Sequence, residues 1–484
     1  MFSRRLLPFA KALLFFTATS LFIASSGKTA TAVVPRGNRI LAMDTNAYDG
    51  QSFASAAADA VAQGVTTTSI HLNWNRIESS PGVFNGPDAA LWQLAIASYP
   101  GYHLNLMLTI GTLDTCQRDV PSDLATTRWN DPTMELRFQY LLNWLWLTAN
   151  NAGQSGLVVA ISIGSEVDVL LSTNTANLDN YSDYTAFFNS ARNFLRASTT
   201  WNNVPTGVST SFAGLSSSNA GIRSAIATLN TSADEVMYTY YPLNADFSVK
   251  DPYTAPVNDT ATVVGLYPGR TIDIFEAGYQ TSSANNSSNS AQQTFVSTMF
   301  GIWDAYYPII HILRFVRQAD LSLADATAFV TGSCSGGTVP GTPASPTVTP
   351  TGGTGSTTWK YYLVAVNSIG QSMPGSTGQT TAGKSTLTSS SYNHLTWTAV
   401  SGASWYDVIR SSAGGSPATT GKIGFTTSTS FDDTGLAASS YTDLTYNFEE
   451  YLRTLGLRYF DPVSGTSDKP GWTQVGIEAH ARGW

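Results

Sequence analysis

Two glutamates close strongly apolar runs of this sequence and are the side chains best placed to do chemistry. Glu166 ends the run AISIGSE, and Glu276 ends the run TIDIFE. Taking a carboxylate out of water in such a run costs free energy, so each glutamate needs a partner or a catalytic task. A buried ion pair with an arginine would explain either one alone. Together they favour a joint task, in which one carboxyl group donates a proton and the other attacks or activates water.

Short apolar runs rich in β-branched residues alternate with stretches of helical period from about residue 38 onward. The helical period is clear at Phe53, Ala57 and Val61, which would share one face of a helix. This alternation predicts parallel strands connected by helices, and no glycine-rich phosphate loop follows the first strand. Eight such units predict an α/β fold, a (β/α)8 TIM barrel. We expect its strands at 39–44, 66–74, 103–111, 157–166, 204–212, 235–242, 271–278 and 309–316.

A barrel of this kind fixes where reactive groups must lie, because its active-site residues come from the C-terminal ends of the strands. Glu166 ends the expected fourth strand, and Glu276 ends the seventh. Other polar and aromatic residues near strand ends are candidate substrate-binding or supporting residues. They are Ser165, Tyr240, Tyr241, Asp44, Asn46, His71, Asn73, Trp74, Asp114 and Arg317.

The composition changes sharply after the expected eighth strand. Gly, Ser, Thr and Pro dominate 332–350, and short β-type runs such as WKYYLVAVN and SWYDVIRSS follow. We therefore expect a linker and a small all-β sandwich over 332–440, inserted after strand eight of a barrel whose main part is 38–331. Helical character returns at 446–456, which we expect to be the eighth barrel helix, so that 446–484 completes the barrel.

The N-terminus has the layout of a secretory signal peptide over 1–32. Arg4 and Arg5 precede an apolar run at 12–24, and small residues follow. This order predicts an exported protein, secreted, periplasmic or at the cell surface, with no stable membrane insertion after cleavage; an uncleaved anchor is the alternative. Export would permit oxidation of the two cysteines, Cys116 and Cys334, and a disulfide and two thiols both remain open.

Composition and motifs argue against several classes of partner and chemistry. The net charge of -8 disfavours binding to nucleic acid, because no excess of Lys and Arg is present to release counterions. The sequence has no HExxH motif and no cluster of Cys and His, so we expect no metal and no organic cofactor. A G-x-S-x-G elbow is also missing, which disfavours a serine triad. We expect a monomer.

The two glutamates together resemble the clan A glycoside hydrolases, the 4/7 superfamily. Members of this clan carry the acid/base at the end of strand four and the nucleophile at the end of strand seven. WNRIESSPGVFN at 74–85 and the final DKPGW are similar to further segments of such families. The resemblance covers about 38–330 and 446–484. It implies a retaining enzyme in which Glu166 is the acid/base and Glu276 is the nucleophile, with the carboxyl groups about 5 Å apart.

The resemblance further implies a carbohydrate substrate with β-glycosidic bonds, an oligo- or polysaccharide. Long connections after the expected strands three and eight predict a cleft for a polymer, and with it an endo-acting β-glycanase. The resemblance also implies that Tyr240 or Tyr241 lies against the nucleophile. The sequence departs from the clan at Ser165, where an Asn usually contacts the sugar 2-hydroxyl.

The stretch TTWKYYLVAVNSIGQSMPGS resembles fibronectin type III or immunoglobulin-like modules. An alternative function is that of a non-catalytic extracellular glycan-binding or adhesion protein on a barrel scaffold. It is suggested by such a module together with the low charge and the aromatic content of 12%.

Overall fold

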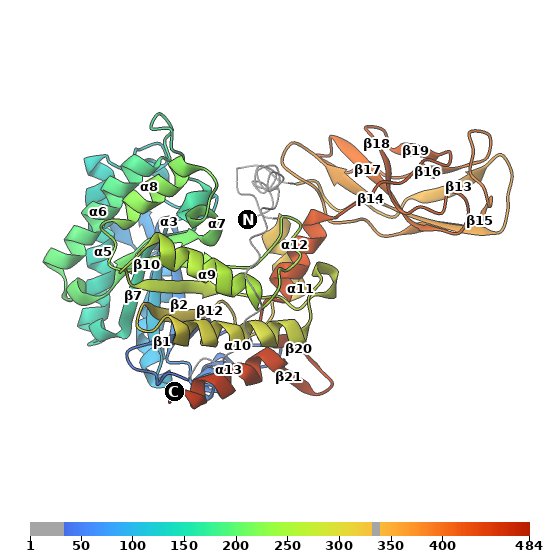
Figure 1. The fold of residues 1–484 in the computed structure, drawn as a ribbon. Coiled ribbons are helices and arrows are strands. Elements are labelled where there is room, and N and C mark those ends of the chain that lie inside the picture. Colours follow the sequence, from blue (N-terminus) through green and yellow to red (C-terminus); the bar gives the residue numbers. More distant parts are fainter. Residues whose placement is uncertain (1–32, 332–338) are drawn as a thin grey trace. The chain divides into compact units, whose positions relative to one another are not determined.

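The computed structural model describes residues 33–331 and 339–484. The predicted signal peptide and Cys334 lie outside these residues. The described chain forms two compact units, coloured along the sequence in Figure 1. Among the described residues, the barrel unit contains 33–244, 249–322 and 453–484, and the sandwich unit contains 245–248, 323–331 and 339–452.

The described part of the barrel unit contains eight parallel strands in a ring, as the sequence predicted. In ring order they run β7, β5, β2, β1, β12, β11, β10 and a strand made of the two short pieces β8 and β9. This strand is interrupted at Val208, and it closes the ring because β8 pairs with β7 while β9 pairs with β10. The bounds are β1 Ile40–Met43, β2 Thr67–Asn73, β5 Asn105–Asp114, β7 Val158–Ser165, β8 Thr206–Gly207, β9 Ser209–Ser211, β10 Val236–Tyr240, β11 Ile272–Ala277 and β12 Ile310–Phe315.

A main helix follows each strand, and in several of these helices a side chain caps the first turn. Ser52, Asp131 and Asn180 each accept a hydrogen bond from a backbone N–H of the helix they precede, which satisfies a donor that lacks an intrahelical partner. The helices are α2 Phe53–Ala62, α4 Pro87–Ser98, α5 Pro132–Asn151, α6 Tyr181–Ser198, α8 Ala220–Asn230, α9 Thr254–Leu266, α10 Asn289–Ala305 and α13 Pro470–Ala481. Shorter elements in the connections are α3 Trp74–Ile77, α7 Phe212–Leu215, β3 Glu78–Ser80, β4 Val83–Phe84, β6 Gln117–Arg118, β20 Arg458–Val463 and β21 Thr466–Asp468.

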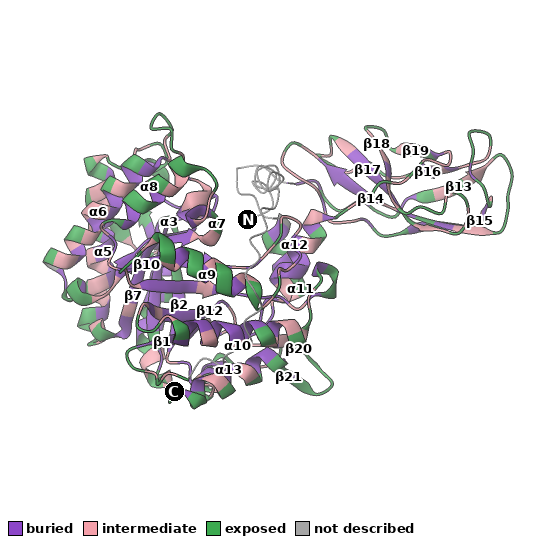
Figure 2. Ribbon diagram, viewed as in Figure 1, coloured by how far each residue is buried: buried purple, intermediate pink, exposed green. Residues whose placement is uncertain are grey.

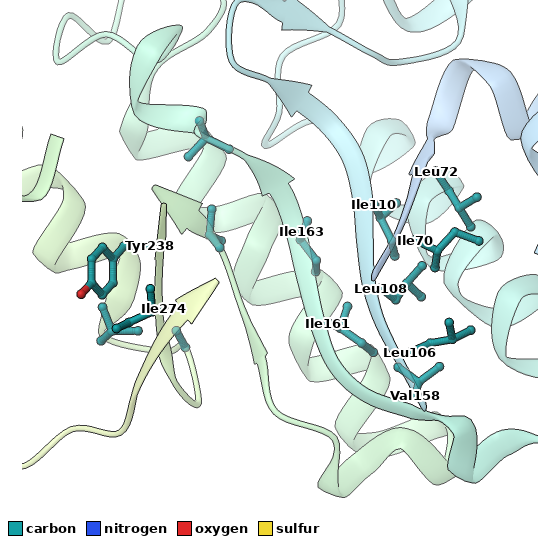
Figure 3. Close-up of a cluster of buried hydrophobic side chains, with 14 of the residues drawn as sticks. Ile70, Leu72, Leu106, Leu108, Ile110, Val158, Ile161, Ile163, Tyr238 and Ile274 are labelled. Atoms are coloured by element: carbon teal, nitrogen blue, oxygen red, sulfur yellow. The ribbon is translucent and has the colours of Figure 1, made fainter. Parts of the chain in front are cut away.

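The barrel strands are buried on both faces, which explains why they appear in the sequence as continuous apolar runs (Figure 2). One face packs on the helices, as Figure 3 shows for side chains of β2, β5, β7, β10 and β11. The other face fills the interior of the barrel with a cluster drawn from six strands: Ala42, Met107, Ala160, Met237, Phe275 and Ile312. The barrel is thus a packed core, and its chemistry must lie at the strand ends.

The segment 446–484 contains two helices rather than the single one we expected at 446–456. The first, α12 Leu444–Arg453, lies in the sandwich unit up to Leu452. The second, α13, packs against α10 and follows β12 as the eighth helix of the barrel. Pro470 starts α13, where its missing N–H costs no hydrogen bond. The preceding Lys469 is buried and donates to Asp320 at 2.7 Å, which ties this helix to the loop after β12.

The insertion between β12 and α13 is a β-sandwich of two antiparallel sheets. The first sheet has the order β13-β16-β19, and the second has the order β15-β14-β17-β18. Trp359, Tyr361 and Leu363 on β14 form its buried core with Leu395 and Val408. The bounds in this unit are α11 Leu323–Thr331, β13 Thr347–Thr351, β14 Thr357–Val366, β15 Gly378–Gly383, β16 Tyr392–Thr396, β17 Trp405–Ala413, β18 Gly421–Thr426 and β19 Ser430–Asp433. Among the helices described, none is long and apolar enough to cross a membrane.

Candidate active site

Glu166 follows β7 directly and is held in a strained backbone conformation. Its φ of 45° lies in the left-handed region, which is uncommon for a residue with a side chain and is often found at functional sites. Gly164 has a φ of 89°, and a Cβ there would lie 2.5 Å from the Tyr184 hydroxyl, so only glycine fits this turn. Ser211 donates from both its N–H and its hydroxyl to Asp168, which fixes the turn after Glu166.

The carboxyl group of Glu166 is buried and shielded from water. Thr239 Oγ1 donates to its Oε1 at 2.6 Å, and Thr115 Oγ1 donates to its Oε2 at 3.4 Å. Burial, together with the negative charge of Glu276, raises the pKa of Glu166 to about 8. The Thr239 hydrogen bond opposes this shift without cancelling it. Glu166 is therefore protonated at neutral pH and can act as a proton donor.

Glu276, near the end of β11, has a different environment. Tyr241 donates its phenol O–H to Oε2 at 2.5 Å, and Arg314 Nη1 lies 3.3 Å from Oε1. Both groups are donors that stabilise negative charge on the carboxylate. The side chain remains 22% exposed, so it is accessible from solvent. Its charge is close enough to Glu166 to raise the pKa of that carboxyl group, so the two glutamates belong to one site.

Arg314 links Glu276 to the end of the first strand. This β12 residue is buried, and its Nε and Nη2 donate to the two carboxylate oxygens of Asp44 at 2.8 and 2.7 Å. Its Nη1 also donates to the backbone oxygen of Phe275 at 2.9 Å, which leaves the guanidinium little freedom. Ser69 completes the group by donating to Asp44 at 2.5 Å. Arg314 is therefore a positioning residue for Glu276, and Asp44 holds Arg314 in place.

Side chains of β10 and of the residue that follows it contact both glutamates. Alternate side chains along a strand point to opposite faces, so residues two positions apart lie on the same face. Thr239 contacts Glu166, and Tyr241 contacts Glu276. Tyr240 points the other way, is buried, and donates to Asp259 of α9 at 3.0 Å. Of the two tyrosines named from the sequence, Tyr241 donates to Glu276, and Tyr240 belongs to the layer between the barrel and its helices.

His71 and Asp114 lie near each other at the same ends of the strands. His71 Nε2 is 3.8 Å from Asp114 Oδ2, and both side chains are partly exposed. Gly111 of β5 makes room for His71 and Asn73, since a Cβ there would lie 2.8 Å from the His71 ring. Asp119, which the sequence did not single out, belongs to this group: burial and the charge of Asp114 raise its pKa to about 6.

Two candidates from the sequence have structural roles. Trp74 is fully buried, packs on Phe138 of α5, and donates its indole N–H to Glu78 at 2.7 Å. It is therefore a core residue and does not contact substrate. Asn46 donates to the Ala319 backbone oxygen at 2.8 Å and accepts from the Ala319 N–H at 2.9 Å, so its amide fastens the loop after β12.

Ser165 and Arg317 remain close to strand ends. Ser165 is buried and pairs in register with Asp114 of β5, and its backbone oxygen accepts from the Thr115 N–H at 2.8 Å. Arg317 follows β12 and is half-buried, and its Nη1 has no hydrogen-bond partner within the described residues. A buried cationic donor of this kind could contact a bound polar ligand.

No family model matches the chain, and no curated protein matches it. Among solved structures it is similar to GH5_18 from Streptomyces cattleya in complex with GlcNAc, with a TM-score of 0.44 and 11% identity over 59% of this chain and 72% of that one. It is also similar to the exo-β-1,4-mannosidase Op5Man5 from Opitutaceae bacterium strain TAV5, with a TM-score of 0.45 and 14% identity over 62% and 56%.

The GH1 β-glucosidase from Exiguobacterium antarcticum B7 gives a TM-score of 0.41 and 10% identity over 59% of this chain and 89% of that one. At such identities and TM-scores the likeness says nothing about substrate or reaction.

The C-terminal strand ends carry one carboxyl group whose pKa is raised by burial, Glu166, and a second, Glu276, that accepts hydrogen bonds from a phenol and a guanidinium. A separate group of possible metal ligands, Glu235, Asp273 and His311, lies at the opposite ends of the strands. The acid and the carboxylate at the mouth suit proton transfer coupled to nucleophilic attack.

Proposed function

We propose that this protein is a retaining β-glycosidase that cleaves an oligo- or polysaccharide. The observation that supports this best is the contrast between two neighbouring carboxyl groups. Burial raises the pKa of Glu166 to about 8, whereas Tyr241 and Arg314 donate to Glu276. One neutral acid beside one charged nucleophile is the arrangement that glycoside hydrolysis requires. A protein that only binds glycans would have no need of a carboxyl group protonated at neutral pH.

In the first step Glu276 Oε attacks the anomeric carbon while Glu166 gives its proton to the departing glycosidic oxygen. The carbon–oxygen bond to the leaving sugar breaks, and a covalent glycosyl ester with Glu276 forms. Thr239 and Thr115 hold the Glu166 carboxyl group in position through this step. Loss of the negative charge on Glu276 in the ester lowers the pKa of Glu166, which suits its next role.

In the second step the Glu166 carboxylate takes a proton from water, and the water oxygen attacks the anomeric carbon. The ester bond breaks, Glu276 regains its charge, and the sugar leaves with its original anomeric configuration. Two inversions give net retention. We assign contacts with sugar hydroxyl groups to Ser165, His71, Asp114 and Arg317, which border the same strand ends.

We further propose endo action on an exported substrate, with the sandwich as a fibronectin type III-like or immunoglobulin-like spacer. The long connection at 115–131, between β5 and α5, starts beside Glu166 at Thr115, and a long connection at this end of the strands supports action on a polymer. Trp359, Trp397 and Trp405 all pack against buried clusters of the sandwich, as expected for a spacer.

Hydrolysis of a panel of plant, algal and fungal β-glycans tests the proposal. We expect at least one glycan to be cleaved at internal bonds, with products that proton NMR first detects as the β-anomer, because double displacement retains configuration. Initial products of α-configuration would overturn the mechanism, and release of monosaccharide alone would overturn endo action. Binding of a glycan without cleavage would favour the adhesion function instead.

Replacing Arg314 with lysine tests its positioning role. Lysine keeps one charge but cannot bridge Asp44, Phe275 and Glu276 with a rigid fork. We expect kcat to fall by about 10- to 100-fold with a smaller change in KM, because the loss affects the transition state more than substrate binding. Steady-state kinetics on a glycan that the wild type hydrolyses give the changes in kcat and KM separately. An unchanged kcat would contradict the role assigned to Arg314.

A further inference from the structure

Three side chains with metal-ligating atoms meet at the N-terminal ends of neighbouring barrel strands. Glu235 precedes β10, Asp273 is the second residue of β11, and His311 is the second residue of β12. β11 pairs with both of the other two strands, so the ring itself brings the three residues together. Glu166 and Glu276 lie at the opposite ends of the strands, which makes this cluster separate from the candidate active site.

The distances within the cluster suit a shared cation. His311 Nδ1 lies 3.1 and 3.0 Å from the two carboxylate oxygens of Glu235, and 3.9 Å from Asp273 Oδ1. One ligand atom from each residue lies within 4.8 Å of the others. Ligands bound to Zn²⁺ at about 2.0–2.2 Å are roughly 3–4 Å apart, so small side-chain movements would complete such a site.

An irregularity in the sheet directs the histidine into this cluster. Ile272 pairs with Ile310, but the next residue, Asp273, pairs with Ile312. His311 is thereby left as an extra residue on β12 with no register partner on β11. Bulges of this kind re-aim side chains and are concentrated near functional sites. The backbone therefore departs from regular pairing at the residue that supplies the imidazole.

The negative charge of the cluster lacks a basic partner other than His311. Asp273 is fully buried; the Ile312 N–H donates to its Oδ1 at 3.2 Å, and no N–H of the described residues donates to its Oδ2, which leaves the Glu235 carboxyl group and His311 as its neighbours in the cluster. The ion pairs of the described chain connect no Lys or Arg to Glu235 or Asp273, whereas the buried Asp304 pairs with both Arg39 and Arg482. A buried unpaired carboxylate is costly unless a cation compensates it.

We infer that Glu235, Asp273 and His311 bind a divalent transition-metal cation of the Zn²⁺ type. One imidazole and two carboxylates suit Zn²⁺ better than Mg²⁺, which prefers oxygen ligands alone. Glu235 and His311 keep 11% and 15% of their side-chain surface exposed, which gives the cation and a water ligand access. A site at this end of the strands stabilises the barrel and takes no part in the reaction at the other end.

Thermal unfolding of the mature chain without a histidine tag tests this inference. After dialysis against EDTA and its removal, Zn²⁺ is added at about 100 times its Kd, with Mg²⁺ as the comparison. We expect Zn²⁺ to raise the Tm by about 4 °C and Mg²⁺ to leave it unchanged. Co²⁺ should bind in the same place and give visible absorption bands that report its coordination.

Matched variants show which residues are needed for the rise in Tm that Zn²⁺ causes. Asp273→Asn keeps the shape of the buried side chain and removes its charge, and His311→Asn provides a second variant if the first unfolds. Asp432→Asn is the control, because Asp432 pairs with an exposed histidine, His394, on the sandwich. We expect the Zn²⁺ shift and the Co²⁺ bands to persist in the control and disappear in the other two. No Zn²⁺ response in the wild type, or an equal response in Asp273→Asn, would overturn the inference.

Discussion

Glu276→Ala is expected to abolish glycan hydrolysis, with a loss of about 10⁴-fold or more in kcat. The variant has no carboxylate to form the glycosyl ester, and removal of a covalent nucleophile usually costs this much. Tyr241 and Arg314 would then face a cavity, which a small anion can enter. Added azide should therefore restore turnover and give a glycosyl azide of inverted configuration, because only one displacement remains. Kinetics with and without azide, followed by NMR of the product, measure both effects.

Glu478→Gln is a suitable control for Glu276→Ala. Glu478 lies on α13 and bonds to Arg482, Gln474 and Ser297, all remote from the strand ends that carry the glutamates. Its loss should leave kcat within about twofold of the wild type. A Glu276→Ala variant that retains more than a hundredth of wild-type activity would remove Glu276 from the role of nucleophile.

Glu166→Gln is expected to make the protein more stable at pH 8, by about 3–5 kcal/mol, with little effect at pH 5. The pKa of Glu166 is raised from its ordinary value of 4.5 to about 8 in the folded protein. Between these values the folded state keeps a proton that the unfolded state releases, so wild-type stability falls as pH rises through this window. Glutamine is neutral at every pH and removes that fall. Urea unfolding of both proteins at pH 5 and pH 8 measures the difference.

The same shift predicts the alkaline limb of the wild-type pH–rate profile. Activity should decline as pH rises through about 8, where Glu166 loses the proton that it gives to the leaving oxygen. Parallel stability curves for the wild type and Glu166→Gln between pH 5 and pH 8 would show that the glutamate is not protonated in the folded state.

The sequence predicted the barrel well because its strands are buried on both faces and appear as uninterrupted apolar runs. It placed Glu166 and Glu276 at strand ends for the same reason. It did not separate Tyr240 from Tyr241, although the twofold period of a strand puts Thr239 and Tyr241 on one face. The break at Val208, which leaves β8 and β9 as short pieces, follows Gly207, and a glycine inside a strand run often marks a bulge or a close backbone approach.

Other residues could be recognised only from the folded chain. Arg314 lies within an apolar strand, where a charge signals a buried partner, but Asp44 is far away in the sequence. Trp74 follows a strand end and looked like a mouth residue, yet a turn of helix, α3, directs it onto Phe138. The helix at 446–456 looked like the last barrel helix because its apolar period is strong, while α13 is only weakly amphipathic.

The position of α13 after the sandwich sets the order in which the barrel can assemble. The helix that packs against α10 starts at Pro470, whereas its strand partner β12 ends at Phe315, so the barrel stays incomplete until the residues after the sandwich have been made. Until then the buried surface of α13, formed by Trp472, Val475 and Ala479, is missing from the outer layer. A sandwich that folds first shortens the loop to be closed and lowers its entropic cost by about 0.7 kcal/mol. Assembly of the barrel therefore depends on α13, and a truncation that removes this helix would leave apolar barrel surface open to aggregation.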